Sequence, residues 1–139
     1  MSDTAVRLVV DSSVAVKWFV SEGEAGVDEA LALKEQHATG ARILAAPSHV
    51  ILEVLNALRS RGLGQSELED AANRLLGTHL DLAPVETLAY RAAAISTQHG
   101  LTVYDAAFVA LAESLDAELV TADRRLAACT ACRTRLLGS

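Results

Sequence analysis

The sequence predicts one α/β domain built around a parallel sheet. Short apolar runs without polar alternation, such as VRLVV at residues 6–10, are typical of strands buried on both faces. These runs alternate with longer stretches of helical periodicity, and no Pro- or Gly-rich linker or repeat separates them. Since 139 residues suffice to bury a substantial core, we expect residues 1–139 to form a single domain.

The first half of the chain is predicted to contain two strands and four helices. In order these are a strand at 6–10, a short helix over VAVKWFV at 14–20, a helix at 24–38, a strand at 42–47, a helix at 48–60 and a helix at 65–80. Ser12 and Ser13 are candidate N-caps of the first helix, and Ser48 of the helix at 48–60, because serine hydroxyls accept hydrogen bonds from the unpaired N–H groups there.

The second half is predicted to repeat the alternation with shorter strands. Its elements are a strand at 80–85, a helix at 87–99, a helix at 103–115, a strand at 118–123, a helical turn at 124–128 and an edge strand at 134–137. Gly100 ends one helix, and Thr102, three residues before Asp105, has the spacing of a capping box for the next.

Four acids occupy positions that suggest a site. Asp11 and Asp123 follow or end predicted strands, and parallel sheets bind ligands at the carboxyl ends of their strands. Asp105 and Glu53 each lie beside the apolar stripe of a helix. Taken singly, each acid has an ordinary role as a helix cap, a loop acid or a solvated side chain. Gathered together they would raise one another's pKa, and a hard cation such as Mg²⁺ or Mn²⁺ would relieve that repulsion.

Four segments resemble the motif blocks of PIN-domain nucleases, and most closely those of the VapC-type toxins of bacterial toxin–antitoxin pairs. They are LVVDSSVAVKWFV, AAPSHVILEVLNAL, LTVYDAAFVALAE and ELVTADRRL, in family order across residues 8–126. The resemblance implies a three-layer α/β/α sandwich around a short parallel sheet and a homodimer. It also implies an Mg²⁺- or Mn²⁺-dependent endoribonuclease that hydrolyses RNA phosphodiester bonds and is restrained by a cognate antitoxin protein.

The resemblance also assigns roles to individual residues. The acids expected to bind the metal and carry catalysis are Asp11, Glu53, Asp105 and Asp123. Ser13 and Thr121 would form hydrogen bonds around the metal, and Asn56 would orient Glu53 from one helical turn away. Thr121 can equally be an ordinary strand residue, and Asn56 an exposed one.

The basic residues near these segments are candidates for RNA phosphate contacts: Lys17, Arg59, Arg61, Arg124 and Arg125. Ordinary surface solubility is their alternative. Trp18 and Phe19 could stack RNA bases, although so apolar a helix favours burial in the core or in a subunit contact. The amphipathic stretches at 24–38 and 65–80 are the candidate partner surfaces, and a basic antitoxin side chain would enter the acidic site.

Bulk composition leaves the nucleic-acid question open. The net charge of −6, from 18 acidic and 12 basic residues, argues against a phosphate-binding surface, but removing four metal ligands from the count leaves only −2.

Cys129 and Cys132 form a late CxxC with too few further ligands for zinc, so we expect two reduced thiols. No apolar run is long enough to span a membrane and the N-terminus is a poor secretion signal, so we expect a cytoplasmic protein without a membrane partner.

Three other functions remain open at this point. A PIN-type nuclease of RNA processing would keep the same acids. A phosphatase or phosphotransferase that uses Asp11 as its nucleophile would want a second acid two residues later, where this chain has Ser13. A non-catalytic binding module would have a degenerate site, yet all four acids are present.

Overall fold

The computed structural model of the chain describes residues 5–20 and 24–138, which form a five-stranded, fully parallel sheet. The strand order is β3-β2-β1-β4-β5. The strands are β1 (Val6–Val10), β2 (Arg42–Pro47), β3 (Asp81–Ala83), β4 (Glu118–Thr121) and β5 (Thr134–Leu136). Leu8 of β1 pairs with Leu44 on one side and with Glu118 on the other, so β1 is the central strand.

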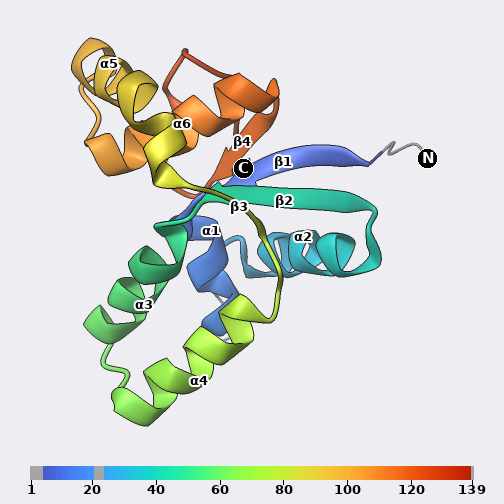
Figure 1. Cartoon of the computed structure of the whole chain (residues 1–139). Helices are drawn as coiled ribbons and strands as arrows, with labels where there is room; N and C mark the ends of the chain where they lie inside the picture. Colours follow the sequence, from blue (N-terminus) through green and yellow to red (C-terminus); the bar gives the residue numbers. More distant parts are fainter. Residues whose placement is uncertain (1–4, 21–23, 139) are drawn as a thin grey trace.

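Helices cover both faces of this sheet, as a three-layer sandwich requires. The helices are α1 (Ser12–Ala15), α2 (Val27–Thr39), α3 (Val50–Ser60), α4 (Gln65–Leu76), α5 (Ala89–His99), α6 (Val103–Leu115) and α7 (Arg124–Ala127), with 3₁₀ turns η1 (Val16–Phe19) and η2 (Val85–Leu88). Figure 1 shows α2, α3 and α4 on one side of the sheet and α5 and α6 on the other. The predicted α/β architecture is confirmed.

The core follows from the apolar runs in the sequence. Val9, Val10 and Leu44 in the central strands are fully buried, as expected for strands covered on both faces. Helix α6 is buried over seven consecutive residues, 106–112, because it packs between the sheet and α5. Trp18 is also buried, and its Nε1 donates to the carbonyl of Ala30 at 2.8 Å, so it is a core residue and not a base-stacking one.

Two predicted helix caps are wrong. Asp11, and not Ser12 or Ser13, caps α1, because its carboxylate accepts from the N–H of Val14 at 3.3 Å. Helix α3 begins after His49, while the N–H of Ser48 donates to Ala83 in the neighbouring strand at 2.8 Å. The Asp11 cap is a local interaction that the sequence also allows, whereas the partner of Ser48 is set by the neighbouring strand.

Several predicted boundaries are also shifted. The helix predicted from residue 24 begins at Val27, after Gly26 with a φ of +82°, which leaves Glu24 outside the helix. The helix predicted to end at residue 80 ends at Leu76, and the following strand covers only Asp81–Ala83. In contrast, α6 has the predicted bounds, and Thr102 caps it as expected by accepting from the N–H of Asp105 at 3.0 Å.

The two cysteines are free thiols, Cys129 buried and Cys132 partly buried. Burial is the main cause that raises the pKa of Cys132 to about 11, so this thiol is protonated at neutral pH. Over the described residues, every helix is too short or too polar to cross a membrane.

Helix α3 offers a matched test of this packing. Leu58 is 1% exposed and Leu52 is 71% exposed on the same helix. We expect Leu58→Ala to lower the free energy of unfolding by about 2–5 kcal/mol, because it removes buried methyl groups and leaves a cavity. Leu52→Ala should change it by less than ~0.5 kcal/mol, as measured by urea denaturation. Equal losses in the two variants would contradict the described orientation of α3.

Candidate active site

Asp11 lies at the carboxyl end of the central strand and is 5% exposed. Both of its carboxylate oxygens are held. Oδ1 accepts from the Ser13 hydroxyl at 2.6 Å and from the N–H of Val14 at 3.3 Å, and Oδ2 accepts from the Thr121 hydroxyl at 2.6 Å. A buried carboxylate is costly unless it is hydrogen-bonded in this way.

The same two hydroxyls join the ends of β1 and β4. Ser13 Oγ accepts from the N–H of Ala122 at 2.8 Å, and Thr121 Oγ1 accepts from the N–H of Asp123 at 3.0 Å. Each hydroxyl therefore donates to Asp11 and accepts from the segment that follows β4. Ser13 and Thr121 lie beside Asp11, where the sequence analysis expected them to support the site.

Asp123 and Asp105 are positioned by helix N-termini. Asp123 caps α7, with its Oδ1 accepting from the N–H groups of Arg125 at 2.9 Å and Leu126 at 3.4 Å. Asp105 lies in the first turn of α6, immediately after the Thr102 cap. Both are therefore placed by local backbone geometry, and the partial positive charge of a helix N-terminus favours a carboxylate there.

Glu53 lies in the first turn of α3 and is only partly satisfied. Its Oε2 is 3.8 Å from Nε2 of His49, one helical turn earlier. Its Oε1 is buried and has no hydrogen-bond partner among the described residues. Asn56, expected to orient Glu53, is exposed on the same helix and so does not hold this oxygen. The neighbours that act on Glu53 are instead His49 and Ser12.

The sequence analysis missed the contributions of His49 and Ser12 to the site. Local signals for both existed, since His49 precedes Glu53 by four residues and Ser12 follows Asp11 directly. The spacing of four residues places His49 on the same helix face as Glu53, but the approach of Ser12 depends on how α1 packs against α3.

Electrostatics tie the four carboxylates together through Asp105. Burial raises the pKa of Asp11 to about 6 against the lowering effect of its hydrogen bonds, and Asp105 raises it further. Burial also raises the pKa of Glu53, with Asp105 again adding to the effect. The pKa of Asp105 itself is raised by burial and then by Asp123. Asp105 is thus the acid that interacts with the other three.

The residues present suit a hard divalent cation. Within the described ranges, no three acidic, histidine or cysteine side chains already converge as a set of metal ligands. The donor set nevertheless consists of carboxylate oxygens, three of these acids have raised pKa values, and Glu53 Oε1 is buried without a partner among the residues that the structure describes. Mg²⁺ and Mn²⁺ prefer such oxygen ligands, and a cation would offset both the cost of burying these carboxylates, which is the main cause of the raised pKa values, and their mutual repulsion.

Two of the five basic candidates are paired with the same acid. Lys17 Nζ lies 3.0 Å from Glu24 Oε1, and Arg61 Nη1 lies 3.1 Å from Glu24 Oε2. Hydrogen bonds from Arg61 and then from Lys17 lower the pKa of Glu24 to about 2, so its carboxylate is ionised at neutral pH. The Lys17 side chain is also only 11% exposed. Both side chains are therefore held in an ion-pair cluster, although one carboxylate offsets only one of the two positive charges.

The other three basic candidates keep exposed side chains. Arg125 donates to the carbonyl of Gly100 and lowers the pKa of Asp105, so its guanidinium lies beside the acids. Arg124 lies next to it on α7, and Arg59 lies near the end of α3. Of these three, Arg125 is the one that the structure ties to the acids, while Arg124 and Arg59 are exposed.

Comparisons with known proteins bear on the family and the fold of this chain. The chain is 59% identical over 34 residues to ribonuclease VapC3 of Pyrobaculum aerophilum, a match that spans 24% of this chain and 26% of that relative. The fold of this chain is similar to that of Mycobacterium tuberculosis VapC20, a sarcin–ricin-loop-cleaving toxin, with a TM-score of 0.69 and 21% identity. The similarity covers 88% of this chain and 95% of VapC20.

A second solved structure has the same fold. It is VapBC2 from Rickettsia felis, bound to a DNA fragment from its promoter, with a TM-score of 0.63, 14% identity and coverage of 94% and 98%. The sequence model of the PIN domain matches residues 8–130, which include all four acids. By its sequence and by its fold, therefore, this chain belongs to the PIN domain family.

Proposed function

We propose that this chain is a metal-dependent endoribonuclease that hydrolyses RNA phosphodiester bonds, and that it is the toxin of a toxin–antitoxin pair. The observation that carries the proposal is the set of four carboxylates, from four separate segments, that interact through Asp105. Membership of the PIN domain family and the partial match to a ribonuclease support it.

In this proposal Asp11, Glu53, Asp105 and Asp123 hold Mg²⁺ or Mn²⁺. Such an ion, when bound, lowers the pKa of a coordinated water and stabilises charge on the phosphoryl oxygens. The rest of the chain positions the ligands. The hydroxyls of Ser13 and Thr121 fix both oxygens of Asp11, and the first N–H groups of α7 fix one oxygen of Asp123. This preorganisation means that little reorientation of Asp11 is needed during the reaction.

The alternative of a covalent aspartyl-phosphate is less well supported. Such an enzyme would want a second acid two residues after Asp11, and Ser13 stands there. A nuclease of RNA processing would use the same acids and differs from a toxin only in its substrate and partner.

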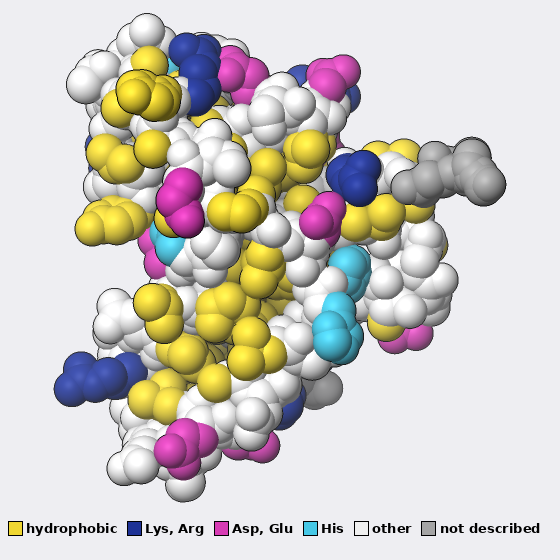
Figure 2. Space-filling view, viewed as in Figure 1, with side chains coloured by type: hydrophobic (Ala, Val, Ile, Leu, Met, Phe, Trp, Pro, Cys, Tyr) yellow, Lys and Arg dark blue, Asp and Glu magenta, His cyan; other side chains and the backbone are white. Residues whose placement is uncertain are grey.

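Partner binding is part of the proposal. Figure 2 shows apolar side chains gathered in a hollowed band between the half of the molecule that carries α5 and α6 and the half that carries α3 and α4. Exposed apolar residues on α3, α4, β3 and η2 include Leu52, Leu76, Leu82 and Val85. An exposed apolar area of this kind favours protein contacts, here with a second copy and with the antitoxin. The antitoxin-bearing assembly named for the Rickettsia felis neighbour supports the second of these partners.

Asp11→Asn tests the proposed chemistry. It keeps the shape of the side chain and removes its charge, so we expect Mg²⁺-dependent cleavage of total cellular RNA to fall by about two orders of magnitude or more. Asp70→Asn, at an exposed acid on α4, is the matched control and should cleave as the wild type does. Mapping of the new RNA ends in Mg²⁺ and in EDTA gives the readout. Cleavage by Asp11→Asn at the wild-type rate would refute the proposal.

The pKa of Asp11 predicts how stability depends on pH without metal. The folded-state pKa of about 6 exceeds the ordinary value of 3.8, so between these two pH values the folded protein binds more protons than the unfolded chain. The free energy of unfolding should therefore fall as the pH rises from the lower value to the higher one. In EDTA at about pH 7.5 we expect Asp11→Asn to be more stable than the wild type by ~1–3 kcal/mol, with the advantage shrinking towards about pH 4. Urea denaturation at several pH values measures this, and a constant difference would contradict it.

The exposed arginines predict a salt-dependent RNA affinity. Arg59→Ala and Arg124→Ala should each weaken binding of single-stranded RNA by about two- to five-fold and reduce the slope of log affinity against log salt by up to ~1. Arg91→Ala is the control, because Arg91 Nε is already paired with Glu113 Oε1 at 2.6 Å. Anisotropy titrations at several salt concentrations in EDTA separate the variants. An equal loss in Arg91→Ala would show that the effect is only one of bulk charge.

A further inference from the structure

His49 links the two helices that carry Glu53 and Asp105. These helices lie in different layers, since Figure 1 shows α3 on one side of the sheet and α6 on the other. Helix α3 packs mainly against α4 and α1, and α6 packs mainly against α5 and the sheet, so neither helix is a main packing partner of the other. A side chain that contacts both helices therefore has a direct influence on how Glu53 lies relative to Asp105.

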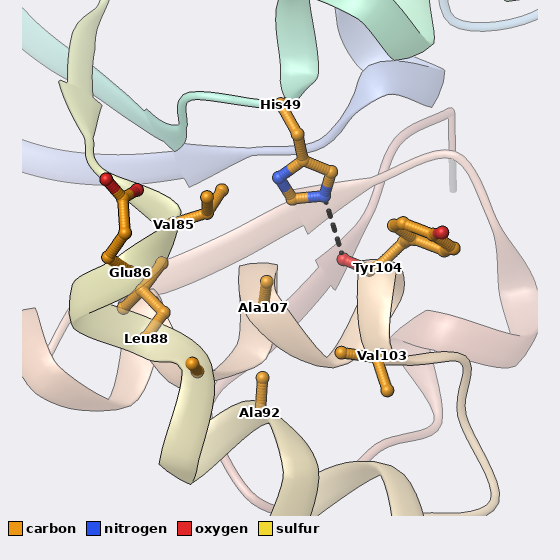
Figure 3. A pocket seen from close by; sticks show the side chains of 9 residues that line it. His49, Val85, Glu86, Leu88, Ala92, Val103, Tyr104 and Ala107 are labelled. Carbon is orange, nitrogen blue, oxygen red and sulfur yellow. Dashed lines mark hydrogen bonds between the residues drawn. The ribbon is translucent and has the colours of Figure 1, made fainter.

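One hydrogen bond of His49 crosses between these layers. His49 directly precedes α3, and its Nε2 lies 3.1 Å from the carbonyl oxygen of Tyr104 in the first turn of α6 (Figure 3). A carbonyl can only accept, so Nε2 carries the hydrogen and is the donor. Because Tyr104 directly precedes Asp105, this bond fixes the part of α6 that carries Asp105 relative to the start of α3.

The same ring lies close to Glu53 and interacts with both acids. His49 Nε2 is 3.8 Å from Glu53 Oε2, which is too long for a hydrogen bond but short enough for electrostatic attraction. Burial raises the pKa of Glu53 and that of Asp105, and Asp105 raises the pKa of Glu53 further, whereas His49 is among the groups that lower both. His49 therefore offsets part of the repulsion between two acids that would share a cation.

Packing alone does not account for a histidine at this position. The ring lies against Phe108, with the two ring centroids 5.0 Å apart. Its Nδ1 is buried without a hydrogen-bond partner among the residues that the structure describes, and such an atom is destabilising. An apolar side chain would fill the same space without this cost, so the benefit of the histidine lies in the N–H group at Nε2.

We propose that His49 is a positioning residue whose hydrogen bond to the Tyr104 carbonyl holds Glu53 and Asp105 in fixed relative positions and so sets the affinity of the site for a divalent cation. This inference rests on the proposed metal-dependent function and adds a residue that acts through the ligands. Replacing a residue that orients metal ligands in this way typically weakens metal binding by about 10- to 100-fold.

Two amide variants separate the hydrogen bond from the mere presence of a polar side chain. In His49→Gln the amide nitrogen can reach the position of Nε2, whereas in His49→Asn, shorter by one methylene, it reaches only the position of Nδ1. His37→Asn is the matched control, because His37 Nε2 also lies 3.1 Å from a carbonyl oxygen, that of His79, but belongs to α2, which carries none of the four acids. Calorimetric titration with Mn²⁺ gives the Kd of each protein without RNA and without cleavage.

We expect His49→Asn to weaken Mn²⁺ binding by about ten-fold or more, and His49→Gln to keep most of the wild-type affinity. His37→Asn should bind Mn²⁺ as the wild type does, even if it unfolds at a lower urea concentration, because its hydrogen bond is remote from the ligands. If His49→Asn fails to fold by circular dichroism, His49→Leu removes the same donor with an apolar side chain.

Equal Kd values in His49→Asn and His49→Gln would overturn the proposal, because the hydrogen bond would then not matter. An equal loss of affinity in His37→Asn would overturn it as well, since the loss would follow from general destabilisation. So would slow RNA cleavage by His49→Asn with wild-type Mn²⁺ affinity, because the ring would then act in the reaction itself. Absence of Mn²⁺ binding by the wild type would instead refute the proposed metal-dependent function, and this inference with it.

Discussion

The burial of one carboxylate, Asp11, organises this molecule. It ends the central strand, caps α1 and accepts hydroxyl protons from Ser13 and Thr121. Those hydroxyls accept from the backbone after β4, so a single charge joins two neighbouring strand ends. The arrangement keeps an acid in a position where desolvation raises its pKa to about 6. Burying this carboxylate lowers the free energy of unfolding but holds a negative charge in a fixed place, a combination that is common at catalytic sites.

A second regularity concerns helix N-termini. Each of the four acids caps a helix or lies in its first turn, on α1, α3, α6 and α7. Parallel strands followed by helices bring such N-termini to one edge of the sheet, where their partial positive charges favour anions. The backbone thereby tolerates a group of carboxylates.

Charge pairing decides which cations remain for a substrate. Glu24 lies outside α2 and engages both Lys17 and Arg61, which join η1 and the end of α3 to the segment before α2. The arginines left exposed near the acids are on α7 and α3.

Sequence alone was sufficient where the controlling interaction is short-ranged. Buried apolar runs identify the strands, the spacing of Thr102 and Asp105 identifies the start of α6, and the four acids stand at strand ends and helix starts that can be recognised locally. Tertiary structure decided what depends on contacts between distant segments. These include the cap of α3, the pairing of Glu24 with Arg61 and the exposure of Asn56. The physical reason is that burial and charge pairing depend on which segments meet in space, and no local spacing encodes that.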